Sequence, residues 1–118
     1  MLAETIMCLW LVSNHLVSTD SEIARNTCEL VAARAREENL DTALVISLAY
    51  HESRLNPNAV SRSGARGPLQ VMPSQCRRWR KFGSPLAKKP SIYWRRCDLV
   101  ASGLWTLQRW LARSPNDR

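Results

Sequence analysis

Residues 41–73 read DTALVISLAYHESRLNPNAVSRSGARGPLQVMP and hold an almost wholly apolar stretch followed directly by a loop-forming one. Asp41 can cap a helix, and positions three and four apart share one helix face. Counted back from Glu52, that face carries only apolar residues, namely Val45, Leu48 and Ala49. We therefore expect Glu52 near the end of a helix, on its apolar face.

A carboxyl at that position is disfavoured in its charged form, both by apolar surroundings and by the negative end of the helix dipole. A glutamic acid that stays protonated near neutral pH can serve as a general acid. Taken alone, Glu52 is more ordinarily a solvent-exposed residue at a helix end. The residues that follow Glu52 favour the role of general acid.

The segment behind Glu52 is punctuated by glycine and proline and contains no acid as far as Pro73. Pro57 cannot continue a helix because it lacks the amide donor. Asn56–Gly67 is rich in Asn, Ser, Pro and Gly, which is typical of a loop. A short helix is expected from Pro73 or Ser74 to about Trp79.

Helical patterns also flank this region on both sides. Thr19 or Asp20 can cap a helix that begins near Ser21, whose apolar side would hold Ile23, Leu30 and Val31. After a connection over Phe82–Pro90, a last helix over roughly Tyr93–Ala112 would align Val100, Leu104, Leu107 and Leu111. The sequence predicts an all-α single domain with one long functional loop after the helix of Glu52.

The charge of the chain is unevenly distributed. The net charge is +7 over 118 residues, yet residues 1–53 carry three basic and eight acidic side chains, and residues 54–118 carry fourteen basic and two acidic ones. The second half therefore favours a polyanionic partner, such as nucleic acid, anionic lipid or the peptide carboxylates of a cell wall. No nucleic-acid-binding motif accompanies it, so no specific nucleic acid is expected.

Four cysteines, Cys8, Cys28, Cys76 and Cys97, permit disulfides outside the cytoplasm but could equally be buried free thiols. They form no CxxC pair, and the two histidines lack ligand spacing, so we expect no metal and no cofactor.

The N-terminal run Ile6–Val12 is apolar and of signal-peptide length, but Glu4 and not a lysine or arginine precedes it. It is not a convincing signal peptide and is too short for a transmembrane segment. We expect a first helix that packs on the core or contacts a partner, and we assign residues 1–22 to an N-terminal extension or atypical leader.

Several elements at matched spacing make residues 52–73 resemble the soluble lytic transglycosylase (SLT) family, which has a goose-lysozyme-like catalytic domain. They are Glu52-Ser53, the segment Asn56–Ser61, Gly64-Ala65 and Gly67–Pro73. Downstream, Gly103, Thr106-Leu107 and Trp110-Leu111 follow the family's last pattern. The resemblance implies a lysozyme-like domain over residues 23–118.

The resemblance further implies cleavage of the MurNAc–GlcNAc β-1,4 bond of peptidoglycan. Glu52 would protonate the glycosidic oxygen and then, as base, take the proton of the C6 hydroxyl, which attacks C1 to give a 1,6-anhydro-MurNAc end. Ordinary glycosidases need two carboxylates, and the only acids after Glu52 are Asp98 and Asp117.

By position in the motif, the resemblance assigns four further residues to substrate binding. Ser61 would bond near the N-acetyl group, Gln70 would bond the sugar or Glu52, and Met72 would pack on the sugar face. Ser53 completes the set, although support of the helix end is its more ordinary role. Trp105 and Trp110 are expected in the core and not at a sugar platform.

Two departures from the family pattern affect these expectations. Pro68 replaces a leucine, and Arg118 ends the sequence before the segment that supplies a tyrosine near the acid, so the domain looks C-terminally short. The alternatives are a hydrolytic muramidase, or a structural subunit of a phage virion or envelope-spanning machine with weak or no activity. The expected localisation is the cell envelope, the periplasm or a phage virion.

Overall fold

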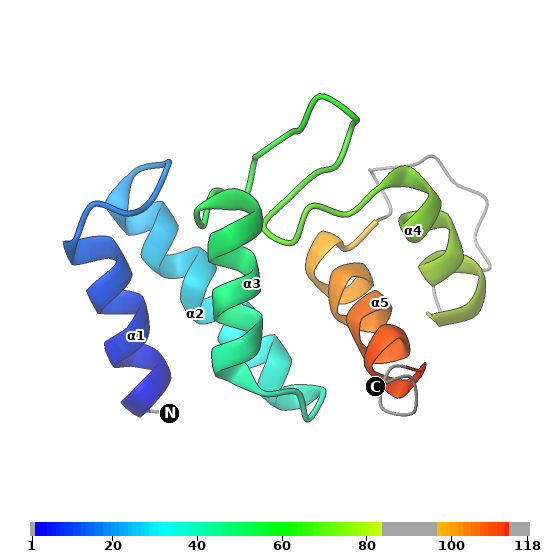
Figure 1. The fold of residues 1–118 in the computed structure, drawn as a ribbon, viewed down its shortest axis with the longest axis horizontal. Coiled ribbons are helices and arrows are strands. Elements are labelled where there is room, and N and C mark those ends of the chain that lie inside the picture. The colour runs from blue at the N-terminus through cyan, green and yellow to red at the C-terminus, as the bar shows by residue number, and fades with distance from the viewer. Residues whose placement is uncertain (1, 84–96, 114–118) are drawn as a thin grey trace.

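The computed structural model of the chain describes residues 2–83 and 97–113, and its regular elements are helices (Figure 1). In chain order they are α1 (Leu2–Ser13), α2 (Ser21–Glu37), α3 (Thr42–Ser53), α4 (Pro73–Arg78), the π-helical turn η1 (Trp79–Gly83) and α5 (Leu99–Arg113). Within these ranges, β-type pairing is limited to isolated antiparallel bridges of Arg66 with Val60 and Val71. The predicted all-α class is confirmed.

Helices α2 and α3 begin where the sequence predicted, each behind an aspartate. The Oδ1 atom of Asp20 accepts a hydrogen bond from the backbone N–H of Glu22 at 2.9 Å, and that of Asp41 accepts one from Ala43 at 3.0 Å. Of the two candidates for the first cap, the chain uses Asp20 and not Thr19. Each cap is worth about 1 kcal/mol of helix stability.

The core forms where α1, α2 and α3 pack on one another and where α2 meets α5. In Figure 1, α3 stands between α1 and the part of the molecule that holds α4 and α5, and α2 crosses behind α3. The larger fully buried side chains come from α2, α3, the segment behind α3 and α5; they are Val31, Val45, Ile46, Leu55, Val71 and Leu104. The residues that precede Glu52 in the sequence and those that follow it therefore pack into one core.

The apolar face predicted for α2 is corrected by the structure. Val31 is buried, but Ile23 and Leu30 are 42% and 48% exposed. The buried face consists mostly of small residues, Ala24, Thr27, Cys28, Val31, Ala32 and Ala35. Small side chains let the neighbouring helices approach closely, so they and not the larger Ile23 and Leu30 occupy the contact.

The apolar run Ile6–Val12 lies within α1, which contacts α2 and α3 as expected of a first helix that packs on the core. Cys8 and Leu11 point inward and are buried, whereas Ile6 and Trp10 are more than half exposed.

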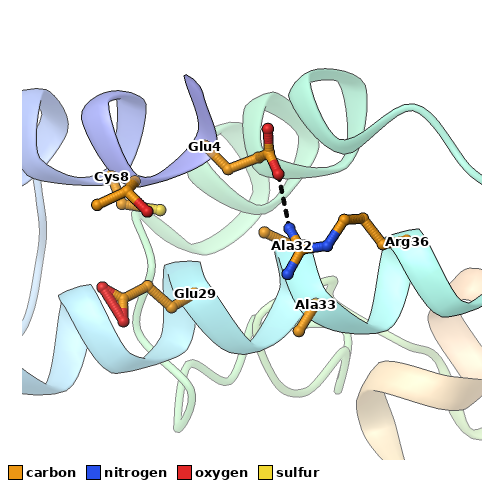
Figure 2. A pocket seen from close by; sticks show the side chains of 7 residues that line it. Glu4, Cys8, Glu29, Ala32, Ala33 and Arg36 are labelled. Atoms are coloured by element: carbon orange, nitrogen blue, oxygen red, sulfur yellow. Dashed lines mark hydrogen bonds and ion pairs between the residues drawn. The ribbon is translucent and has the colours of Figure 1, made fainter. Parts of the chain in front are cut away.

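A hollow of about 290 Å³ lies between α1 and α2, and Figure 2 shows the ion pair that closes one side of it. Arg36 Nη1 of α2 lies 2.6 Å from Glu4 Oε1 of α1. In the same view Glu29 extends along α2 away from that pair, and it forms its own longer contact with Arg25 at 3.8 Å. The hollow thus lies along the boundary between the two helices, and an ion pair joins them at one end of it.

The structure resolves the state of the cysteines, which the sequence left open. Cys8 of α1 is bonded to Cys28 of α2, and Cys76 of α4 is bonded to Cys97, which precedes α5. The first bridge therefore joins two consecutive helices, and the second joins α4 to the start of α5.

Helix α5 begins later than the sequence predicted. Cys97 and Asp98 are not helical, and Asp98 Oδ1 accepts hydrogen bonds from the backbone N–H groups of Val100 and Ala101 at 3.1 and 2.9 Å. An aspartate that bonds these amides fixes the helix start at Leu99. Tyr93 and most of the Phe82–Pro90 connection lie outside the described residues; Phe82 itself belongs to η1.

Candidate active site

The chain turns away from α3 immediately after Glu52 and Ser53. Arg54 and Leu55 both adopt left-handed backbone conformations, with φ of 52° and 65°. Such a conformation costs a non-glycine residue about 1–2 kcal/mol. Burial of a leucine contributes about 1.5–3 kcal/mol, and Leu55 is fully buried. Its packing therefore offsets the strain of the turn and fixes the direction in which the chain leaves Glu52.

Residues 54–72, which connect α3 to α4, are held by their own backbone. The N–H of Gly67 donates to the carbonyl of Ala59 at 3.0 Å, and Arg66 and Val71 exchange two hydrogen bonds of 2.9 Å. These bonds fold the segment back on itself and bring residues 69–71 beside the end of α3. A short turn-rich segment thus acquires a defined shape without a sheet.

Gln70 locks the middle of this segment with its side chain. The Nε2 atom donates to the carbonyls of Gly67 and Ala59 at 2.9 and 3.1 Å. Because both neighbours are acceptors, the amide must present its NH₂ group to them. The Oε1 atom of the same amide remains available to the surface that Gln70 lines.

Two glycines allow this segment and α5 to meet. A Cβ atom at Gly67, where φ is +85°, would lie 2.8 Å from Leu99 Cδ1, and one at Gly103 of α5 would lie 2.7 Å from Leu69 Cδ1. Any larger residue would push the two apart. The contact forms the floor of the surface groove described next.

A groove of about 280 Å³ opens between α3, the 54–72 segment, α4 and α5, and we call it the Glu52 groove. Its residues on the first three elements are Leu48, Glu52, Leu69, Gln70, Val71 and Gln75. Its residues on α5 are Gly103, Thr106, Leu107 and Trp110. The groove combines an apolar wall with a few amide and hydroxyl groups and one acid. That composition suits a ligand with both apolar faces and hydrogen-bonding groups.

The position of Glu52 differs in one respect from the expectation. The side chain lies at the end of α3 and in the groove, but it is exposed and not enclosed by the apolar face. Val45 and Ala49 on the same face are buried because α3 packs there on the core, whereas the last turn of α3 extends beyond that packing. Leu48 and Leu69 line the groove beside the carboxyl without covering it.

Ser53 lies one residue after the acid but is only 6% exposed. Its hydroxyl is 2.9 Å from the carbonyls of both Ala49 and Pro68. It joins the end of α3 to the loop and is not among the residues that line the groove. These bonds favour the role at the helix end, and its contact with sugar stays a prediction.

Ser61 and Met72 do not line the Glu52 groove. The Ser61 hydroxyl accepts a hydrogen bond from the Ala65 amide at 3.0 Å, within the turn it belongs to. Met72 precedes α4, and its amide donates to Gln75 Oε1 at 2.8 Å. Both are partly exposed, and their contacts with sugar stay predictions. Of the proposed binding residues, Gln70 lines the same groove as Glu52.

Sequence reasoning missed most of the residues from α5. Trp110, expected in the core, is 56% exposed and lines the groove with Thr106 and Leu107. The signal was present in the spacing: Trp110 lies three residues after Leu107 and beside the predicted apolar stripe, so it borders that stripe on the surface side.

The described residues contain neither a cluster of metal ligands nor a membrane-spanning helix. Over residues 2–83 and 97–113, no three His, Cys, Asp or Glu side chains gather in a way that could hold a metal ion. In the same ranges no helix has both the length and the hydropathy needed to span a membrane.

Comparison with known proteins gives one finding. The family model described as "Transglycosylase SLT domain" matches residues 29–117. Neither the curated proteins nor the solved structures contain a significant match.

Proposed function

The chain belongs to the family of transglycosylase SLT domains, and from that premise we propose that it cleaves peptidoglycan strands with Glu52 as the catalytic acid. Membership carries a peptidoglycan-cleaving function of the lytic transglycosylase type in general, and with it an all-α, lysozyme-like domain. The catalytic residue, the chemistry and the product are our proposal.

The observation that carries the proposal is that Glu52 is the only acid among the described residues of its groove. The amides of Gln70 and Gln75 and the hydroxyl of Thr106 can bond sugar hydroxyl and N-acetyl groups. The indole of Trp110 and the leucines can cover the apolar face of a pyranose ring.

With one carboxyl, the reaction must use that group twice. Glu52 donates its proton to the glycosidic oxygen as the bond to C1 breaks. The resulting carboxylate then takes the proton of the C6 hydroxyl as that oxygen bonds to C1, which leaves a 1,6-anhydro ring and restores the acid. The substrate's own N-acetyl group can assist in place of a second carboxylate, as in the recognised exceptions to the two-carboxylate scheme.

Asp98, one of the two acids that follow Glu52 in the sequence, is already engaged. Its Oδ1 caps α5, and its Oδ2 lies 3.1 Å from Arg34 Nη2. These bonds support its exclusion from the reaction. Asp117 lies outside the described residues.

We also propose that the protein works outside the cytoplasm, in the cell envelope. Both disulfides support this location, because such bonds persist in oxidising compartments and are rare in the reducing cytoplasm.

A digest of purified peptidoglycan, with mass spectrometry of the released fragments, tests the reaction. We expect fragments lighter by one water than hydrolytic products, and a rate at least about a hundredfold lower for Glu52→Gln. Fragments with ordinary reducing ends would instead make the protein a hydrolytic muramidase. Equal activity of Glu52→Gln would remove Glu52 from its role.

A further inference from the structure

The Glu52 groove continues into a second hollow of about 230 Å³. Gln75, Thr106 and Trp110 line both, so the two share a wall made by α4 and α5. The residues found only in the second hollow are Arg78, Trp105, Arg109 and Arg113, and we call it the arginine pocket. A chain bound at Glu52 can extend into it without leaving the surface of the protein.

None of the described residues that line the arginine pocket is an acid. Arg34 and Arg36 elsewhere in the molecule are paired with Asp98 and Glu4. Within residues 2–83 and 97–113, by contrast, none of the three pocket arginines forms an ion pair with an acid. All three side chains are exposed. Three exposed arginines that line one hollow without acidic partners favour an anionic ligand.

The geometry of Arg109 suits a planar anion. Its guanidinium carbon lies 4.8 Å from the centroid of the Trp105 ring. Stacking on an aromatic face orients the guanidinium plane and leaves its N–H groups at the edge free to form paired hydrogen bonds. A carboxylate accepts such a pair in one plane.

We propose that the arginine pocket binds free carboxylates of the peptide attached to the sugar strand, and so makes the protein prefer peptide-bearing over bare glycan. This rests on the proposed function, because the glycan in the Glu52 groove is what delivers the peptide to the pocket. The muramic acid residue carries its peptide through a lactyl group on the sugar ring, so the free carboxylates of the peptide accompany the bound strand.

The test measures binding to the full chain carrying Glu52→Gln, so that ligand is not consumed. Three probes are compared: a tetrasaccharide with its peptides, the same tetrasaccharide stripped of peptides, and one with its peptide carboxylates converted to amides. We expect the first to bind about tenfold more tightly than the other two.

Adding Arg78→Gln and Arg109→Gln should abolish that difference and leave binding of the stripped probe unchanged. The matched control adds Arg25→Gln and Arg77→Gln, which remove the same charge from exposed positions outside the pocket; it should keep the tenfold preference. Equal thermal unfolding of the two double variants would show that the fold is intact.

Equal binding of all three probes would overturn the proposal, and so would a preference that survives the loss of Arg78 and Arg109. A short DNA duplex that binds more tightly than the peptide-bearing probe, through the same arginines, would overturn it in favour of nucleic acid. Failure of the wild type to cut peptidoglycan would refute only the proposed function, because the binding preference is measured without cleavage.

Discussion

Glu52 and Ser53 are consecutive on α3 and have opposite environments. Successive helical residues are rotated by about 100°, so Glu52 faces the groove while Ser53 faces the interior and is 6% exposed. The serine hydroxyl contacts the Pro68 carbonyl and thereby ties the loop to the helix. Glu52 is thus open to a ligand while Ser53 holds the loop against the end of α3.

Trp110 offers a prediction at this scale. Replacing it with alanine should raise KM for peptidoglycan by about three- to tenfold with little change in kcat, because an aromatic contact with the bound strand is lost. Trp10→Ala is the matched control: it removes an indole that is 58% exposed, against 56% for Trp110, from α1 and outside the groove. Steady-state kinetics on soluble glycan strands give both constants. The same KM rise in both variants would argue against a sugar contact at Trp110.

The 54–72 segment shows how an element without regular structure becomes rigid. Paired backbone hydrogen bonds close it, and the Gln70 side chain donates to two of its carbonyls. Gly67 and Gly103 then let the segment and α5 contact each other closely. The groove is therefore as stable as the contact between this segment and α5.

The start of α5 provides a prediction about that contact. Asp98→Ala should lower the free energy of unfolding by about 0.5–2 kcal/mol, because the helix loses its cap. Asp98→Asn should recover most of that loss, since asparagine caps as well as aspartate and the exposed pair with Arg34 contributes at most about 1 kcal/mol. Urea denaturation measures both values.

Neither Asp98 substitution should lower kcat nearly as much as Glu52→Gln does. A hundredfold fall in kcat for Asp98→Asn, with stability retained, would mean that a second carboxylate takes part in the reaction.

The molecule as a whole is bridged twice, once on each side of the Glu52 groove. The two disulfides close chain segments of nearly equal length, with sequence separations of 20 and 21 residues. On the chain-entropy account each therefore contributes about 3 kcal/mol. They differ in position: Cys8–Cys28 joins α1 to α2, whereas Cys76 is next to Gln75, which lines both hollows.

This difference predicts separable effects. Replacing either pair with alanines should lower the free energy of unfolding by about 2–4 kcal/mol. Only the Cys76→Ala/Cys97→Ala variant should also raise KM, because only that bridge holds α4 against the groove. Thermal unfolding together with kinetics below both melting temperatures tests this. An equal rise in KM for Cys8→Ala/Cys28→Ala would show a general loosening instead.

Much of the fold could be predicted because its signals are local. Asp20 and Asp41 mark helix starts through bonds to amides two residues away, and Pro57 lies where a helix cannot continue. The same local reasoning misplaced the start of α5, because helical periodicity continues upstream of Asp98 while the cap lies at Asp98. It also misjudged Ile23, Leu30 and Trp110, whose exposure depends on which neighbours pack against each helix.

By itself, then, the sequence determined the helical class, the position of Glu52 at a helix end, and the family, since these depend on spacing along the chain. The tertiary structure alone decided that α5 supplies the far wall of the groove, that Ser53 is buried, how the cysteines pair, and that three arginines line one hollow with Trp105. Those features depend on contacts between residues that are far apart in the sequence. The same helical pattern of apolar residues is compatible with many such contacts, and only packing around a shared core selects among them.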